Sequence, residues 1–291
     1  MNTSLQITND RASLSATLKG GCITSYSIQT SESDLEILRS FGQRNKASFP
    51  LIPYSNRIKE GRFSFEGKQY QLPLNFGKHP HSIHGVGWQE NWQLIEHEAN
   101  HIIMELYHPG TTWPFPFKAR QIIKLNGADL YNEIQLTNLA SKSMPAGLGM
   151  HPYFPRHGKA FLTAEVGQVW QTNETGLPIE RKNCPPNWNL SAGVNVDKLH
   201  CDNQFDPWSR TAFIHWPKKN TSLSLTSSED LNRLVVYAPE NENFFCVEPT
   251  SHITDAFNNT SLGKFPQETG MRVLAPNETW TVWMTLSPKQ E

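Results

Sequence analysis

Alternation of apolar and polar residues at every second position is the pattern that most restricts how this chain can fold. It is clearest at residues 279–287, where one parity holds Trp280, Val282, Met284 and Leu286 and the other holds Thr281, Trp283 and Thr285. Successive side chains of a β-strand point to opposite faces, so this segment predicts a strand with one buried face. Amphipathic helix patterns are scarce, and only residues 31–40 are expected to hold a short helical turn.

Further strands are predicted at many short segments rich in β-branched and apolar residues. They are residues 12–18, 22–28, 92–97, 101–107, 121–125, 130–136, 160–166, 222–225, 234–237 and 244–247. Turn-forming residues separate them, as at 126–129 and 238–241, and the chain holds 20 Pro and 18 Gly. Many short strands with many turns predict an all-β sandwich or barrel. We find no repeat or linker, so residues 1–291 are expected to form a single domain.

Charge and cysteine content exclude several classes of partner. The formal net charge is −1 and charged residues are scattered, so neither nucleic acid nor an anionic membrane is expected to bind. No apolar run is long enough to span a membrane, and the first ten residues lack the features of a signal peptide. The four cysteines form no C-x-x-C pair, which favours reduced thiols. A cytoplasmic location is therefore expected.

Two segments before residue 90 carry polar groups between turn residues. Pro50 and Pro53 indicate a loop or an edge strand, followed by Asn56 and Arg57, whose donors and acceptors suit vicinal hydroxyls of a sugar. Taken alone, this pair is also typical of an ordinary surface turn. Residues 79–88 contain three histidines, but no neighbouring cysteine or acidic residue completes a metal site, so no metal is predicted there. The preferred interpretation is that His84 points into a pocket and that His79 and His81 are loop residues.

The most chemically suggestive residues are one histidine and one glutamate, far apart in sequence. His151 precedes Pro152 and two aromatic residues, and Glu248 follows an apolar strand and precedes Pro249. Glu248 is expected at the C-terminal end of that strand, where partial burial would raise its pKa above about 4.3. A carboxylate base and an imidazole acid together suffice for proton transfer without a cofactor. Either residue alone is equally typical of a packed or ion-paired structural role.

An ordered set of motifs resembles the aldose 1-epimerase (galactose mutarotase) family. They are Asn-Arg-Ile at 56–58, Gly-Arg-Phe at 61–63, Ile-His-Gly at 83–85, Gly-Met-His-Pro-Tyr-Phe at 149–154, Asp-Asn-Gln-Phe at 202–205, Glu-Pro at 248–249 and Asp-Ala-Phe-Asn at 255–258. Each motif is weak alone, but together they span roughly residues 50 to 260 in family order.

The resemblance implies a fold, a reaction and a site. The fold is a single-domain β-supersandwich of mostly antiparallel strands with a shallow sugar cleft. Glu248 resembles the base that deprotonates the O1 hydroxyl, and His151 resembles the acid that protonates the ring oxygen, so that the sugar opens and recloses as the other anomer. Arg57, His84 and Asp202 resemble residues that hold sugar hydroxyls, beside Asn56. The substrate would be a small sugar, with no cofactor or metal, and the protein a monomer or weak homodimer.

Departures from the best-known galactose-specific members leave the preferred sugar open. The chain is shorter, and the segments before His84 and His151 differ. A sugar-6-phosphate 1-epimerase would need a basic cluster, for which Lys59, Arg62 and Lys78 are candidates. A non-catalytic sugar-binding or sensor protein on the same fold is a second hypothesis. A glycoside hydrolase using Glu248 with Asp202 is a third. Trp88 and Phe205 are candidates for stacking on the sugar or for the core.

Overall fold

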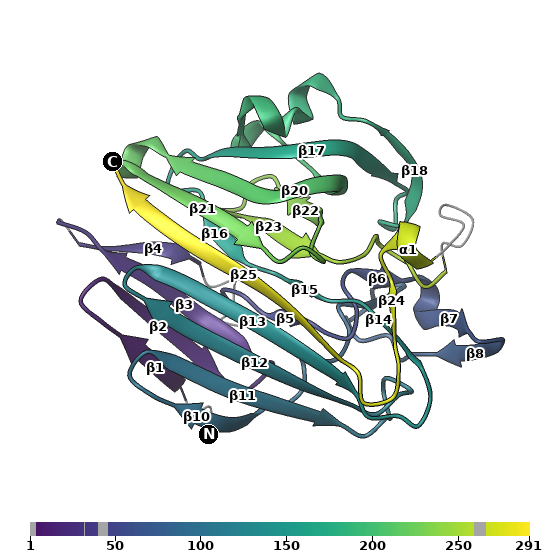
Figure 1. Ribbon diagram of the computed structural model, residues 1–291. Helices are drawn as coiled ribbons and strands as arrows, with labels where there is room; N and C mark the ends of the chain where they lie inside the picture. The colour runs from purple at the N-terminus through teal and green to yellow at the C-terminus, as the bar shows by residue number, and fades with distance from the viewer. Residues whose placement is uncertain (1–3, 32, 40–45, 259–265) are drawn as a thin grey trace.

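The computed structural model describes residues 4–31, 33–39, 46–258 and 266–291, which form antiparallel sheets with little helix (Figure 1). A four-stranded sheet at the start of the chain has the order β1 (Ser4–Thr8), β2 (Ala12–Thr17), β3 (Cys22–Gln29) and β4 (Asp34–Leu38). The single α-helix of the described part is α1 (Pro266–Thr269). None of the described helices has both the length and the apolar character that a membrane span requires.

A large sheet occupies most of the rest of the chain. Its path runs through β10 (Gln93–His97), β11 (His101–His108), β12 (Phe117–Asn126), β13 (Asp129–Asn138), β25 (Thr279–Gln290), β21 (Thr221–Ser227), β20 (Asp202–Trp216), β22 (Arg233–Tyr237), β23 (Phe244–Thr250), β15 (Gly149–Met150) and β5 (Pro50–Leu51). Every neighbouring pair on this path is antiparallel. The all-β, mostly antiparallel prediction is confirmed.

Shorter strands attach to this frame. β16 (Tyr153–Pro155) pairs with β23, while β17 (Phe161–Thr172) pairs with β18 (Pro178–Asn183), β19 (Val194–Asn195) and β20. Three two-stranded ribbons join β6 (Arg57–Ile58) to β9 (Ser82–Ile83), β7 (Arg62–Phe65) to β8 (Lys68–Gln71), and β14 (Met144–Ala146) to β24 (Arg272–Leu274). Short 3-10 helices lie at Lys59–Gly61, Pro186–Trp188, Leu190–Ala192, Val196–Lys198 and Pro217–Lys219.

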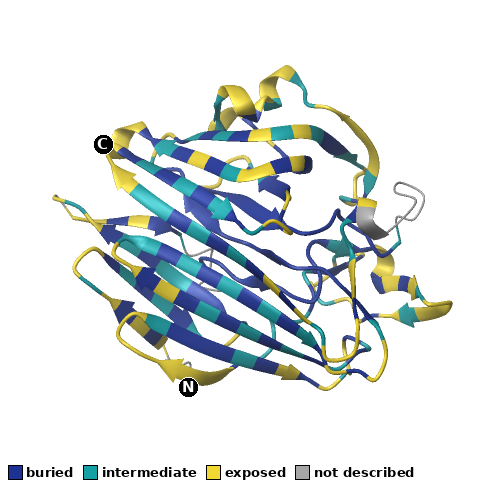
Figure 2. Ribbon diagram, viewed as in Figure 1, coloured by how far each residue is buried: buried dark blue, intermediate teal, exposed yellow. Residues whose placement is uncertain are grey.

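The period-two pattern predicts burial well (Figure 2). On β25, Trp280, Val282, Met284 and Leu286 are all buried, and the residues between them are more exposed. The buried faces of the four-stranded sheet and of β11–β13 contribute to one apolar cluster, so the two sheets share a core. The predicted turn at 126–129 closes the β12–β13 hairpin, with Asn126 opposite Asp129.

Two predictions about local structure are wrong. Residues 34–38 form strand β4 and not a helical turn; positions 32 and 40 of the predicted turn lie outside the described residues. Alternating burial explains the strand, because Leu35 and Ile37 enter the core while Asp34 and Glu36 face solvent.

The second error concerns the end of β23, which the sequence pattern places at Glu248. The strand continues to Thr250, with Leu234 opposite Pro249. The fixed φ of proline is close enough to an extended conformation for the strand to pass through it. Glu248 therefore lies within a sheet strand, flanked by β22.

Candidate active site

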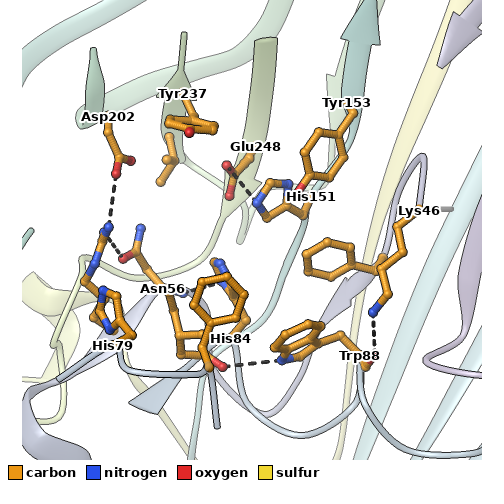
Figure 3. A pocket seen from close by; sticks show the side chains of 15 residues that line it. Lys46, Asn56, His79, His84, Trp88, His151, Tyr153, Asp202, Tyr237 and Glu248 are labelled. Carbon is orange, nitrogen blue, oxygen red and sulfur yellow. Dashed lines mark hydrogen bonds and ion pairs between the residues drawn. The ribbon is translucent and has the colours of Figure 1, made fainter. Parts of the chain in front are cut away.

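A cleft of about 530 Å³ opens beside β22 and β23, within the size range of small-molecule sites. All six residues predicted from the sequence line it: Asn56, Arg57, His84, His151, Asp202 and Glu248. Figure 3 shows five of them, Asn56, His84, His151, Asp202 and Glu248, converging from separate elements. Segments far apart in sequence meet here because β23 pairs with both β15 and β16.

The pair His151 and Glu248 lies at the wall of this cleft. Nε2 of His151 is 3.3 Å from Oε1 of Glu248, and their side chains are only 8% and 3% exposed. Oε2 of Glu248 and Nδ1 of His151 are buried and have no hydrogen-bond partner within the described part of the protein. A buried polar atom without a partner is costly. These two atoms are therefore available to a ligand or to water.

The local sequence explains how the pair is positioned. Glu248 is opposite Val235 on β22, and both side chains line the cleft. His151 lies in the two-residue connection between β15 and β16, and its backbone N–H donates to the carbonyl of Phe49. Pro152 favours an extended conformation at the residue before it. Both side chains are thus held by sheet backbone.

Burial dominates the electrostatics of the pair. It lowers the pKa of His151 to about 3 and raises the pKa of Glu248 well above its usual value, with a further increase from the charge of Asp202. Burial penalises the charged form of each group. The expectation of partial burial at Glu248 is corrected to nearly complete burial.

His84 and Asn56 hold each other through the backbone. The N–H of His84 donates to the carbonyl of Asn56 at 2.8 Å, and the N–H of Asn56 donates to Nδ1 of His84 at 3.1 Å. Since Nδ1 accepts, the ring proton of neutral His84 lies on Nε2. Burial and the nearby His151 lower the pKa of His84 well below its usual value. His84 therefore offers an N–H donor at Nε2.

Gly85, the residue after His84, is needed for this arrangement. A Cβ on Gly85 would lie 2.0 Å from the carbonyl oxygen of Ile52, on the segment that leads to Asn56. Asn56 and His84 themselves have positive φ angles of 58° and 60°. Left-handed backbone at non-glycine residues is uncommon and concentrates at functional sites. Close backbone approach thus places both side chains at the cleft.

Arg57 connects Asn56 to Asp202. Its guanidinium donates to Oδ1 of Asn56 at 2.8 Å and to Oδ2 of Asp202 at 3.0 Å (Figure 3). A Cβ on Gly176, in the β17–β18 turn, would lie 2.5 Å from Cζ of Arg57. The turn thus packs directly against the guanidinium. Asp202 accepts a hydrogen bond from Arg57. It is therefore not the free second carboxylate, beside Glu248, that the hydrolase hypothesis requires.

Aromatic side chains form the remaining wall. The rings of Phe49 and Tyr153 both lie 4.6 Å from that of His151, and Trp88 stacks on Phe49. Nζ of Lys46 lies 4.4 Å from the centre of the Trp88 ring and donates to the Trp88 carbonyl. Trp88 is thus at the cleft, whereas Phe205 is fully buried in the core.

Other residues line the cleft that were not predicted from the sequence as site residues. They are Lys46, Phe49, Phe76, His79, Ile83, Tyr153, Val235 and Tyr237. His79 and Tyr153 belong to the segments that contain His84 and His151, so their positions beside these two histidines could have indicated them. Val235 and Tyr237 become detectable only once β22 is paired with β23. The basic candidates Lys59, Arg62 and Lys78 are not among the lining residues of the described chain.

Two further buried groups, Asp255 and Cys246, lie close to these elements. Asp255 accepts a hydrogen bond from the backbone N–H of Lys59, which fastens the β6 segment. Cys246 is fully buried in a small apolar cluster with Phe49, Tyr153 and Trp88. Its thiol also lies near the ligand atoms of His151 and Glu248.

Comparison with known proteins identifies the relatives of this chain. Residues 3–287 match the family model described as aldose 1-epimerase. The uncharacterised protein YphB of Escherichia coli (strain K12) is 26% identical over 246 residues, covering 82% of each chain. Galactose mutarotase of Rattus norvegicus is 27% identical over 135 residues, covering 45% of this chain and 38% of its own length. A solved Escherichia coli K12 structure, provisionally described as an aldose 1-epimerase, superposes with a TM-score of 0.90 at 24% identity and full coverage of both chains.

Proposed function

Because the chain belongs to the aldose 1-epimerase family, we propose that it is an isomerase that interconverts the α and β anomers of a free aldohexose. The observation that carries this proposal is the 3.3 Å contact between Nε2 of His151 and Oε1 of Glu248 at the wall of the cleft. Anomer exchange needs one proton removed from O1 and one delivered to the ring oxygen. Two adjacent groups of different proton affinity supply both transfers.

The pair is active when it carries one proton more than the combination of a neutral imidazole and an ionised carboxylate. Carboxylate with imidazolium, and carboxylic acid with imidazole, are two arrangements of that same proton count. In the first arrangement Glu248 takes the O1 proton while His151 gives its proton to the ring oxygen, and the C1–O5 bond breaks to leave the aldehyde. Glu248 is then the acid and His151 the base. Rotation about C1–C2 and the reverse transfers close the ring as either anomer.

The other polar residues are proposed to hold the sugar hydroxyls. Nε2–H of His84 and the guanidinium of Arg57 are donors, and Asp202 is an acceptor already oriented by Arg57. Hydrogen bonds that are made equally before and during ring opening contribute to binding and not to the chemical step. These residues are therefore expected to affect KM more than kcat.

Charge favours an unphosphorylated substrate. Lys46 is the lysine that lines the described cleft, and its Nζ donates to the Trp88 carbonyl. Arg57 is engaged by Asn56 and Asp202. A phosphate group is usually bound by several donors, and the described lining residues lack the clustered cations that such a group would require. We therefore propose a neutral aldohexose such as galactose or glucose.

Polarimetry of freshly dissolved α-D-galactose and α-D-glucose tests the proposal directly. The wild-type protein is expected to accelerate the approach to anomeric equilibrium, and Glu248→Gln and His151→Asn are each expected to reduce that acceleration by at least about 100-fold. Glu133→Gln and His101→Asn serve as controls, because neither residue lines the cleft. Circular dichroism of each variant establishes that it is folded.

Three outcomes would contradict the proposal. A fully active Glu248→Gln variant would remove the proposed base. Saturable sugar binding without any acceleration would favour the non-catalytic sugar-binding hypothesis. Release of free sugar from an aryl glycoside would instead favour the hydrolase hypothesis.

A further inference from the structure

Three side chains of different donor type come together beneath the cleft. The ligand atoms of His151, Cys246 and Glu248 all lie within 4.8 Å of one another, and all three residues are buried. Cys246 and Glu248 are two positions apart on β23 and so share a face. β16 pairs with β23 so that Tyr153 is opposite Cys246, which places His151 beside the same face. The sugar chemistry proposed above uses two of the three and leaves the thiol without a role.

The spacing is close to that of a tetrahedral zinc site. Zn²⁺ binds imidazole nitrogen and carboxylate oxygen at about 2.0–2.2 Å and thiolate sulfur at about 2.3 Å, so its ligand atoms are separated by roughly 3.3–3.6 Å. The His151–Glu248 distance of 3.3 Å already matches. All three ligand atoms lie within 4.8 Å of one another, so the thiol sulfur would need to move closer by at most roughly 1 Å.

Two further arguments favour a bound cation. Oε2 of Glu248 is buried without a hydrogen-bond partner among the described residues, so this carboxylate has an unused acceptor beside the cluster. A thiolate and a carboxylate would also balance the two positive charges of Zn²⁺, and a site of zero net charge suits a buried position. Mixed nitrogen, sulfur and oxygen donors favour zinc over magnesium, which prefers oxygen ligands alone.

We propose that His151, Cys246 and Glu248 form a three-ligand Zn²⁺ site that inhibits the enzyme by occupying both groups of its acid–base pair. The open fourth coordination position faces the cleft, since His151 and Glu248 line it. Zinc and sugar therefore compete for the same space. The inhibitory part rests on the proposed function, whereas the metal site does not.

Direct metal binding is the first test, made on the intact chain. Zn²⁺ affinity is measured by competition with a chromogenic chelator, and Co²⁺ is added separately to look for the absorption of a cobalt–thiolate bond. The wild type is expected to bind one ion, and Cys246→Ala is expected to weaken binding by about 100-fold or more, since even an outer-shell partner of a metal contributes about 10- to 100-fold. The cobalt–thiolate absorption should vanish in that variant. Mg²⁺ should not compete.

Two further variants test whether the effect on zinc binding is specific to the thiol of Cys246. Cys184→Ala removes the cysteine that is partly exposed, and zinc binding should persist in it. Cys246→Ser preserves side-chain volume if the alanine variant proves unstable, and it should also bind weakly. Equal affinity of the wild type and Cys246→Ser, or no binding by the wild type, would overturn the site.

Activity provides a separate readout. Zn²⁺ is expected to slow mutarotation competitively with sugar in the wild type, and about 100-fold more Zn²⁺ should be needed in Cys246→Ala. Zinc binding without inhibition would overturn the inhibitory part alone. A protein that binds zinc through Cys246 but never accelerates mutarotation would contradict the proposed function and leave the metal site standing.

Discussion

Nε2 of His151 and Oε1 of Glu248 lie 3.3 Å apart in a nearly solvent-free wall, so the two groups titrate as one unit. Burial lowers the pKa of His151 to about 3 and raises the pKa of Glu248 well above its usual range. The pair therefore keeps a single shared proton over a wide pH interval. In the proposed reaction, loss of that proton would leave nothing to donate to the ring oxygen, and gain of a second proton would leave no base for O1.

The first prediction is a bell-shaped pH dependence of enzymatic mutarotation. Activity should be lost on the acid side near the lowered pKa of about 3, where the second proton binds. On the alkaline side it should fall as pH rises through the raised pKa of Glu248, because the shared proton is then released. Polarimetry across the pH range, corrected for the uncatalysed rate, measures both limbs. An enzymatic rate that increases steadily into alkali would contradict the shared-proton mechanism.

A second prediction separates binding from chemistry. Arg57→Lys should raise KM about 10- to 100-fold with little change in kcat, because a single ammonium cannot hold both Asn56 and Asp202 as the planar guanidinium does. A hydrogen bond to a charged group contributes about 1.5–3 kcal/mol, which corresponds to that range. Arg62→Lys is the matched control, since the Arg62 side chain is 67% exposed and does not line the cleft. A fall in kcat with KM unchanged would place Arg57 in the chemical step instead.

The sequence predicted the strands and the candidate pair for a physical reason. Alternation of apolar and polar residues predicts alternating burial in segments such as β25. His151 and Glu248 are recognisable because they are ionisable residues among apolar neighbours. Where the pattern was short or contained a proline, as in β4 and at the end of β23, local signals were insufficient. In β4, the strand conformation follows from the burial of Leu35 and Ile37 in the core.

Other parts of the site depend on long-range pairing and carry no local signal. Tyr237 reaches the cleft because it pairs with Cys246 across β22 and β23. Gly176 reads as an ordinary turn glycine, yet its missing Cβ is what leaves room for Arg57. Such relationships follow from the order of strands, which the sequence pattern did not determine.

The third prediction concerns that glycine. Gly176→Ala should displace the Arg57 guanidinium and raise KM by about tenfold, since the new Cβ would lie 2.5 Å from Cζ. The turn has little freedom to retreat, because Oδ1 of Asn173 accepts from the backbone of both Thr175 and Leu177. Gly176 also has a φ of 80°, so alanine adds about 1 kcal/mol of backbone strain.

Gly67→Ala is the control that separates backbone strain from displacement of the Arg57 guanidinium. Gly67 has a comparable φ of 72° in a hairpin turn, and a Cβ there meets nothing within 4 Å. It should lower thermal stability to a similar degree while leaving KM unchanged. If both variants raised KM equally, the effect would belong to general destabilisation and not to Arg57.

The last prediction links buried His252 to stability. Its Nε2 accepts from the backbone N–H of Ser55 at 2.9 Å, and its Nδ1 donates to the carbonyl of Ile253, so the folded state requires the neutral ring beside the Asn56 segment. Burial lowers its pKa from 6.5 to about 4. Between those values the unfolded chain binds a proton that the folded chain does not, so stability falls as pH decreases from about 6.5 to 4 and this contribution levels off below.

Urea unfolding of wild type and His252→Gln at several pH values measures this contribution. At pH 7 the variant should be less stable by about 1–3 kcal/mol, because the Ser55 N–H loses a well-placed acceptor. Towards pH 4 the stability of the wild type should fall by on the order of 3 kcal/mol relative to the variant, so the two become equally stable or the order reverses, since only the wild type carries the cost of keeping His252 neutral. A wild-type-to-variant difference that stays constant with pH would mean that His252 accepts a proton in the folded state as readily as in the unfolded one, and that the hydrogen bond to Ser55 does not hold its ring neutral.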